Sequence, residues 1–541
     1  MPRLETNVLD FPKSVRAGIS VLIALMLVAC APPSVDLAPP SANTPWRPAV
    51  DAAGEIQVGP SATGTNDQAA SHELPANPVL GLLPPASPAV DESHVYTLPE
   101  LIDLAQSNNP RTRIAWNAAR AAAAAVGVTR AEYLPHLSAS VVAGYQRFDN
   151  SNSVLGLALD NRNWASGSVS ALALQWLLFD FGQRDAVHEV ARNVSLAANI
   201  QFSFAHQQVI HEVSQAFYAY AAARTHVDTA DKSHRNAIEI EQAARDRQRQ
   251  GIGTVIDVAQ AQQATAQAQL ARVQAQGGAQ TTYFALIAAV GISPLAHLKV
   301  ADVSDRKLST ATAAPVERIV SEALARRPDM LAAYTLYKAS QANVAAAEAS
   351  FRPKIFLSAV GSYGTGRLGV TALPSLEQQT ITNTVTSRGP AGSVLLGVTV
   401  PLYDGGLRHA TVSQARADAE RAAATLDKTR SDAVLQIVQA QDSLQTSLSA
   451  YEAAVVLEAA ARTTFDARLD AYRHGVGTVT EVALADTQWL LSRNASADSY
   501  SHALSAATTL AFATGALGTA PLEEGLWHEH RRVSTLPSDQ R

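Results

Sequence analysis

Two hydrophobic patterns alternate along the chain. Ala and Leu recur at helical spacing over residues 98–132 and again over 316–350, which predicts one helix in each stretch, ended by Pro135 and by Pro353. Two runs of alternating small polar and apolar residues follow each helix, a pattern typical of strands with one face in water and one in lipid. The predicted strands are 137–148, 164–179, 355–363 and 393–403.

A helical pattern then continues after Asp180 and after Asp404. In both places 71 positions lead to the next glycine motif, at Gly251 or Gly475, enough for a helix of about 100 Å. About 40 further positions allow a returning helix of about 60 Å, and the short and returning helices, stacked end to end, match the long one. The second long stretch carries a coiled-coil stripe at Ile437, Gln441, Leu444, Leu448, Tyr451 and Val455.

These matching elements come from an internal repeat. At an offset of 218, Pro110 corresponds to Pro328 and Tyr145 to Tyr363. At an offset of 224, Phe-Asp-Phe-Gly-Gln-Arg at 179–184 corresponds to Tyr-Asp-Gly-Gly-Leu-Arg at 403–408. We therefore predict a tandem duplication of about 220 residues per unit. The copies are 95–298 and 316–517, and residues 299–315 link them.

The segments outside the duplication differ in composition. Basic residues precede a short apolar run at 19–28, which predicts a lipoprotein signal peptide over residues 1–29. It ends in Leu27-Val28-Ala29-Cys30, which resembles the bacterial lipobox, so Cys30 is predicted to carry the acyl anchor. The alternative is an ordinary signal peptide with a chance cysteine. Residues 30–94 are rich in Pro and Ala and predict a tether, and residues 518–541 form a polar tail.

Composition excludes several function classes. Hydrophobic residues make up 47% of the chain but aromatic residues only 6%, which favours long, closely packed, Ala-rich helices over several large cores. A net charge of −6 argues against a nucleic-acid binder that depends on phosphate contacts. One cysteine excludes a disulfide framework or a cysteine-held metal cluster. No enzyme, cofactor or metal site is predicted, because no P-loop, G-x-S-x-G or H-E-x-x-H motif occurs.

One glycine motif resembles a nucleotide-binding loop without its context. Residues 364–369 read Gly-Thr-Gly-Arg-Leu-Gly, but Pro374 follows soon after and no helix begins there. We expect an external loop at this position.

The strands constrain the assembly. No apolar run reaches the roughly 18 residues of a spanning helix, so a membrane crossing would use strands. Four strands are too few for a closed pore, and open edges are not tolerated in lipid. Other copies of the chain must therefore complete the sheet.

The junction motifs, the Tyr133-Leu134-Pro135 segment and the Gly-x-Gly-Thr turns resemble those of the TolC-type outer-membrane efflux channels over about residues 95–517. The resemblance implies a homotrimer in the outer membrane of a Gram-negative bacterium. Twelve strands would form a β-barrel, and the coiled-coil helices would form an α-barrel through the periplasm. Its partners would be a periplasmic adaptor, an inner-membrane pump and outer-membrane lipid. Cys30 points to the lipoprotein branch.

The resemblance also implies a gate at the periplasmic tip, lined by carboxylates after the second glycine turn. Glu481 falls on the first of two such positions and Leu484 on the second, with Asp486 nearby. Asp257 is the repeat equivalent of Glu481. Three symmetry-related carboxylates would favour cations in the lumen. The helix-tip turns themselves contain Gly251, Gly253, Gly475 and Gly477.

The function expected from the resemblance is the exit of small molecules, drugs or metals, through a tripartite efflux system. Two alternatives remain at this stage. The same fold would serve as the outer-membrane component of a type I protein secretion system, with polypeptide cargo. A lipid-anchored envelope scaffold without transport is the other, and it would not need its strands.

Overall fold

The computed structural model describes residues 49–51, 56–57, 90–154, 157–303, 308, 316–371 and 382–517. The predictions for the signal peptide, for Cys30 and for the polar tail lie outside these residues. The chain divides into two units, Met1–Pro88 and Ala89–Arg541. In the first unit, β1 (Ala49–Val50) pairs antiparallel with β2 (Ile56–Gln57).

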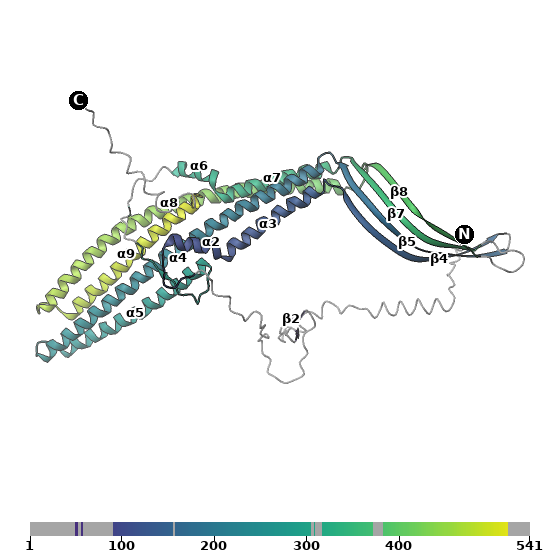
Figure 1. The fold of residues 1–541 in the computed structure, drawn as a ribbon. Coiled ribbons are helices and arrows are strands. Elements are labelled where there is room, and N and C mark those ends of the chain that lie inside the picture. Colours follow the sequence, from purple (N-terminus) through teal and green to yellow (C-terminus); the bar gives the residue numbers. More distant parts are fainter. Residues whose placement is uncertain are drawn as a thin grey trace, which may run out of the picture. The chain divides into compact units, whose positions relative to one another are not determined.

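The second unit repeats one order of elements, helix, helix, strand, strand, long helix, returning helix (Figure 1). The first copy consists of α2 (Leu98–Asn108), α3 (Pro110–Ala131), β4 (His136–Val154), β5 (Leu157–Phe179), α4 (Gln183–Arg249) and α5 (Val255–Val290). The second copy consists of α6 (Val316–Arg326), α7 (Pro328–Ala349), β7 (Lys354–Thr371), β8 (Thr382–Thr399), α8 (Leu407–Arg473) and α9 (Val479–Ala513). A short parallel pair, β3 (Val95–Tyr96) with β6 (Lys299–Val300), accompanies the first copy.

The prediction of one helix over 98–132 and one over 316–350 is wrong, because each stretch is two helices. Pro110 and Pro328 occupy the first helical position of α3 and α7, and proline forces the preceding residue out of the helical region. Asn109 and Arg327 are accordingly extended, with ψ angles of 126° and 127°.

The residues at these breaks, Asn109 and Arg327, contact the C-terminal ends of the returning helices α5 and α9. Asn109 Nδ2 donates to Ala289 O at 2.9 Å, and Arg327 Nη1 donates to Ala513 O at 2.7 Å. Two different side chains therefore satisfy equivalent carbonyls at the C-termini of α5 and α9. The ends of α5 and α9 therefore meet the starts of α3 and α7, which is the end-to-end stacking that the lengths predict.

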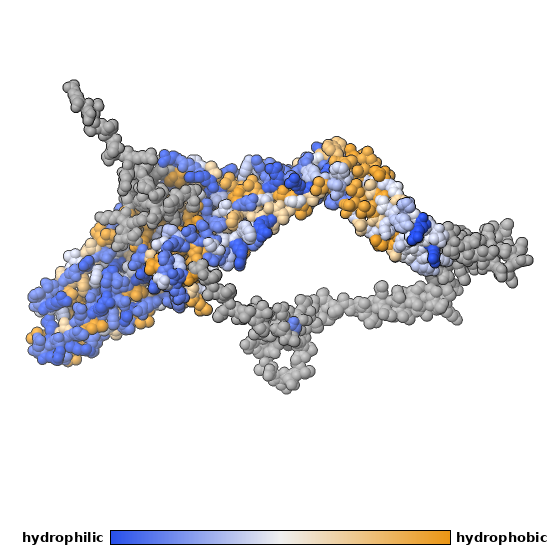
Figure 2. Space-filling view, in the orientation of Figure 1, coloured by the Kyte–Doolittle hydropathy of each residue, from blue (hydrophilic) through white to orange (hydrophobic). Residues whose placement is uncertain are grey.

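The four long strands form one antiparallel sheet in the order β4-β5-β7-β8. They are longer than predicted at most ends, but β8 stops at Thr399, before the predicted end at residue 403. Residues 364–369 lie inside β7 rather than in a loop, because hydrogen bonding across the ladder holds a Gly-rich run that side-chain alternation alone would not predict. Most of the large apolar residues lie on one face, which carries Leu137, Val141, Leu172 and Leu396, while Val142 and Leu395 lie on the other. Orange surface covers the sheet beside the helices in Figure 2.

The strand-to-helix junctions explain the paired motifs. Asp180 accepts from the backbone amide of Arg184 at 2.9 Å and from its Nε at 3.1 Å, while the same guanidinium donates to Leu177 O at 2.7 Å. Asp404 and Arg408 form the equivalent pair, with an Nε to Oδ2 distance of 2.5 Å. Each Asp–Arg pair thus fixes the end of a strand to the first turn of a long helix.

The helices form the rest of the second unit, with the sheet at one end and the turns that join α4 to α5 and α8 to α9 at the other (Figure 1). The largest apolar cluster lies where α2, α4 and α5 meet, with Leu101, Val213 and Leu286 completely buried. A second cluster, around Ile240, Phe465 and Val482, packs the four helices near the turns. Among the described helices, none combines the length and the apolar character of a membrane-crossing helix.

Candidate functional site

The two helix-tip turns have the same backbone structure. Gly251 and Gly475 adopt positive φ angles of 79° and 84°, which side chains rarely tolerate. A Cβ atom on Gly253 would lie 2.9 Å from the backbone nitrogen of Gln248, and one on Gly477 would lie 3.2 Å from that of Tyr472. Backbone geometry thus accounts for all four glycines, two through φ and two through close packing.

The first turn uses its carboxylate to begin the returning helix. The Asp257 carboxylate accepts from Thr254 N at 2.9 Å and from Thr254 Oγ1 at 2.8 Å, and Asp257 N donates to Thr254 Oγ1 at 3.1 Å. This is a capping box. Hydrogen bonds from the backbone and then from the side chain of Thr254 lower the pKa of Asp257 below its usual value. Its charge is therefore directed at the start of α5.

The carboxylate of the second turn, on Glu481, does not cap its own helix. Glu481 N donates to Thr478 Oγ1 at 3.3 Å, but the Glu481 side chain points instead to Arg468 of α8, with Nη1 and Oε2 3.3 Å apart. Both side chains are about half exposed, at 52% for Arg468 and 46% for Glu481. Leu484, one turn later, is also exposed. The two positions of the predicted gate therefore lie on one open face of α9.

Asp486 lies on a different side of α9. Five residues of helix rotate it about 140° from Glu481, so that its side chain faces α4 and is buried. Ser233 Oγ donates to it at 2.5 Å and Asn236 Nδ2 at 3.0 Å. Burial raises the pKa of Asp486, and these two hydrogen bonds oppose the rise. In this conformation Asp486 joins two helices and does not line the face that carries Glu481.

Polar contacts link α4 to α9 along much of their length. Beyond Asp486, they include Arg493 Nη2 with Asp228 Oδ2 at 2.8 Å and Gln215 Nε2 donating to Ser505 O at 2.9 Å. No motif in the sequence predicts Arg468, Ser233 or Asn236 as partners of these carboxylates. Arg468 lies 13 positions before Glu481, so a hairpin of α8 and α9 brings the two together. Ser233 and Asn236 on α4, in contrast, lie about 250 positions before Asp486 in the chain.

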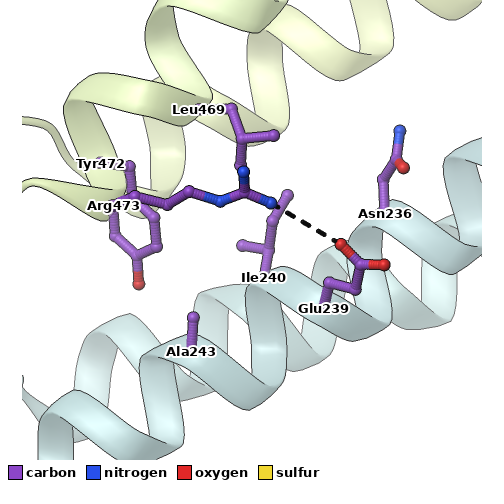
Figure 3. Close-up of a pocket in the computed structure, with 7 residues that line it drawn as sticks. All are labelled: Asn236, Glu239, Ile240, Ala243, Leu469, Tyr472 and Arg473. Atoms are coloured by element: carbon purple, nitrogen blue, oxygen red, sulfur yellow. Dashed lines mark ion pairs between the residues drawn. The ribbon is translucent and has the colours of Figure 1, made fainter.

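A shallow pocket lies between α4 and α8 near the turns (Figure 3). Its walls are joined by Arg473 and Glu239, 3.9 Å apart, across the side chains of Ile240 and Leu469. Beside it, Arg247 Nη1 donates to Tyr472 O at 3.0 Å, with its guanidinium over the Tyr472 ring. Nothing here resembles a catalytic constellation, and the described residues contain no group of three or more side chains suited to hold a metal ion.

Comparisons with known proteins identify relatives of the whole repeated region. The sequence model of the Outer membrane efflux protein family matches residues 101–292 and 319–516, more than half of the chain. Protein CyaE of Bordetella pertussis is 29% identical over 446 residues, covering 81% of this chain and 88% of that protein. Outer membrane protein OprJ of Pseudomonas aeruginosa is 27% identical over 395 residues, covering 70% and 77%.

A solved structure has the same fold. A membrane protein from Pseudomonas aeruginosa superimposes with a TM-score of 0.63 at 24% identity, and the match covers 82% of this chain and 99% of that one. At this identity the likeness supports the architecture alone.

Proposed function

Because the chain belongs to the outer membrane efflux protein family and is an outer-membrane exit channel of tripartite efflux, we propose that it conducts small molecules, drugs or metal ions, from the periplasm to the outside. The observation that carries the proposal is the family match over both repeats. The architecture supports it, since the chain supplies a sheet with a mostly apolar face and two helices of 67 residues each that can line a long path.

We assign the gate to the tip, with Glu481 as its main carboxylate. Support comes from its position beside the turn, its half-exposed side chain and its place on the same face as Leu484. Asp257 is the weaker candidate because its carboxylate is engaged by Thr254. Asp486 is assigned to the α4–α9 contact instead.

The proposed partners are two further copies of the chain, a periplasmic adaptor and an inner-membrane pump. Apolar side chains stand open at both turns: Ile252 is 65% exposed, Val255 70% and Val476 86%. With the pocket between α4 and α8, they offer an apolar surface with charged borders for the adaptor. An acyl anchor on Cys30 would add to the attachment supplied by strands in the outer membrane.

Deletion of the gene in its native host tests the cargo. We expect the mutant to accumulate small toxic compounds and to secrete its polypeptides normally, with the full-length gene restoring export. A mutant with normal resistance that loses an exported polypeptide would instead support type I secretion. If the purified protein shows no conductance in lipid bilayers, that result would support the alternative of an envelope scaffold without transport.

Mass spectrometry of the mature protein tests the anchor. We expect a chain that begins at Cys30 and carries a diacylglyceryl group, and we expect Cys30→Ser to abolish the adduct. A mature chain that begins elsewhere without lipid would exclude lipidation.

A further inference from the structure

The sheet within one chain has two open edges. β4 pairs with β5 and β8 pairs with β7, so within the described residues no strand covers the outer side of β4 or of β8. Exposed apolar residues occur on both edge strands: Val141 is 75% exposed and Val398 is 62% exposed. A strand edge of this kind is a template for another strand, and in lipid it must be paired.

We propose that β8 of one copy pairs antiparallel with β4 of the next copy in a register set by the internal repeat, with Thr399 opposite Ser140. The reasoning starts from the pairing of β5 with β7 inside the chain. That pairing joins the last strand of the first repeat to the first strand of the second. The contact between copies, β8 to β4, joins the last strand of the second repeat to the first strand of the next chain's first repeat.

The strand pairings of the two repeats correspond residue by residue. In the first hairpin, His136 pairs with Gln175. Adding the offset of 218 to the first residue and 224 to the second gives Lys354 and Thr399, which do pair in the second hairpin. The two hairpins therefore share one register, and the six extra residues of the second repeat fall between Thr371 and Thr382.

The same offsets give the register between copies. Gln175 pairs with Ser358 across the β5–β7 contact. Adding 224 to Gln175 gives Thr399, and subtracting 218 from Ser358 gives Ser140. The neighbouring pair, Leu174 with Ala359, likewise gives Val398 opposite Val141.

The apolar face of the sheet supports this register independently. Residues directly opposite in an antiparallel pair point to the same face. Following the pairings from β4 through β5 and β7 to β8 places Val141 and Val398 on one face, and Ser140 and Thr399 on the other. The proposed register keeps both faces continuous, whereas a slip by one residue would join the mostly apolar face to the more polar one. The remaining alternatives are shifts by two residues.

The helices point to the same arrangement. Inside the chain α4 faces α9 through Asp228 with Arg493 and through Gln215 with Ser505. The repeat maps the first pair to Glu452 on α8 and Gln269 on α5, and the second to Gln439 and Thr281. All four of these side chains are exposed in the single chain. A Gln amide facing a Glu carboxylate preserves a hydrogen bond where the chain's own contact has an ion pair.

Cysteine pairs test the strand register in the full-length protein. We expect Ser140→Cys/Thr399→Cys to form disulfide-linked dimers and trimers under mild oxidation, because opposite residues have Cβ atoms about 5 Å apart. The matched control is Gln175→Cys/Ser358→Cys, which should link within one chain without a change in oligomer size. Single variants control for the natural cysteine, Cys30. Ser138→Cys and Val142→Cys, each combined with Thr399→Cys, should link weakly, since diagonal neighbours lie about 7–8 Å apart.

Preferential linking at Ser138 or Val142 would overturn the register while leaving the assembly intact. If the control pair links within the chain and none of the three test pairs links between chains, β4 does not cover β8. The inference rests on the proposed assembly of several copies and not on its cargo. Light scattering that still gives a trimer, or bilayer conductance, would then separate failure of the register from failure of the proposed function.

A charge exchange tests the helical contact. Gln269→Glu would place two carboxylates together, so we expect trimers that dissociate at a lower temperature, and Gln269→Glu/Glu452→Gln should restore the wild-type value. Strictly additive effects of the two substitutions would show that these residues are not neighbours.

Discussion

Three acidic side chains near the helix tips differ in role because their surroundings differ. Asp257 is held by its own N-cap, Glu481 meets an arginine in solvent, and Asp486 is buried against α4. Asp257 and Glu481 even occupy equivalent positions in the two repeats. The shorter Asp side chain closes a capping box with Thr254, whereas the longer Glu side chain extends to Arg468.

Removing the Asp257 carboxylate should loosen the start of α5. Asp257→Ala leaves two donors of Thr254 without their acceptor and is expected to cost about 1 kcal/mol locally. Hydrogen exchange of the first turn of α5 should accelerate about fivefold. The matched control is Glu481→Ala in α9, which should change exchange much less. Equal effects at both positions would contradict the capping role.

Asp486 should give the α4–α9 contact a distinctive pH dependence. A carboxyl group whose pKa is raised by folding destabilises the folded form at pH values above that pKa, and the cost disappears as pH falls below the unfolded value. Acidification should therefore protect the amides of α9 near Asp486 from exchange, after correction for the intrinsic rate.

Asp486→Asn should abolish this pH response and keep the contact, because an amide also accepts from Ser233. Asp486→Ala should destabilise the contact by about 1–3 kcal/mol, since the buried donors of Ser233 and Asn236 lose their partner. A pH response unchanged in Asp486→Asn would assign it to another group.

At the scale of elements, each returning helix ends in a glycine that packs against the residue between the two short helices of its repeat, Asn109 or Arg327. Gly291 ends α5 with a φ of 81°, and a Cβ atom there would lie 2.8 Å from Asn109 Cα. Gly515 has a φ of 68°, and its nearest atom would be Arg327 Cα at 3.3 Å. Both positions have a positive φ angle that disfavours side chains, but a Cβ atom has less room at Gly291 than at Gly515.

We therefore expect Gly291→Ala to lower stability more than Gly515→Ala. Positive φ costs each variant about 1–2 kcal/mol, and the backbone of Asn109 must move further to admit a Cβ at 2.8 Å than the backbone of Arg327 must move for one at 3.3 Å. Thermal unfolding in detergent measures the difference. Gly127→Ala in α3 is the control, because a Cβ there meets nothing within 4 Å, and it should be neutral or stabilising. A larger loss in Gly515→Ala would refute the packing argument.

At the scale of the whole molecule, the gate depends on the assembly. One Glu481 paired with Arg468 is an ordinary surface ion pair, but three copies brought together at the tip would raise the local negative potential. Glu481→Gln should lower cation selectivity and weaken block by multivalent cations in bilayer recordings. Asp257→Asn is the control and should change both much less. An unchanged reversal potential and cation block in Glu481→Gln would place the gate elsewhere.

The repeat, the mainly helical fold with four long strands, and the two glycine turns followed from the sequence. Periodicity and turn residues are local properties, and two copies at constant offsets reinforced each other. The sequence pattern does not predict the break at Asn109, although Pro110 is an anchor of the repeat, because the Ala-rich pattern continues across it. The pattern does not predict the strand ends, because Gly- and Ser-rich segments alternate weakly and are ordered by hydrogen bonds to the neighbouring strand.

Asp257 caps its own helix through Thr254, three residues earlier, but only the tertiary structure decided what Glu481 and Asp486 do. Asp486 and its partners Ser233 and Asn236 are separated by about 250 residues, and their contact requires α4 and α9 to lie side by side. The sequence placed Glu481 and Asp486 together because they are five positions apart, but helical rotation directs one to solvent and the other into the interface. Local pattern determined which elements form, whereas the packing of distant helices determined which side chains remain free to act.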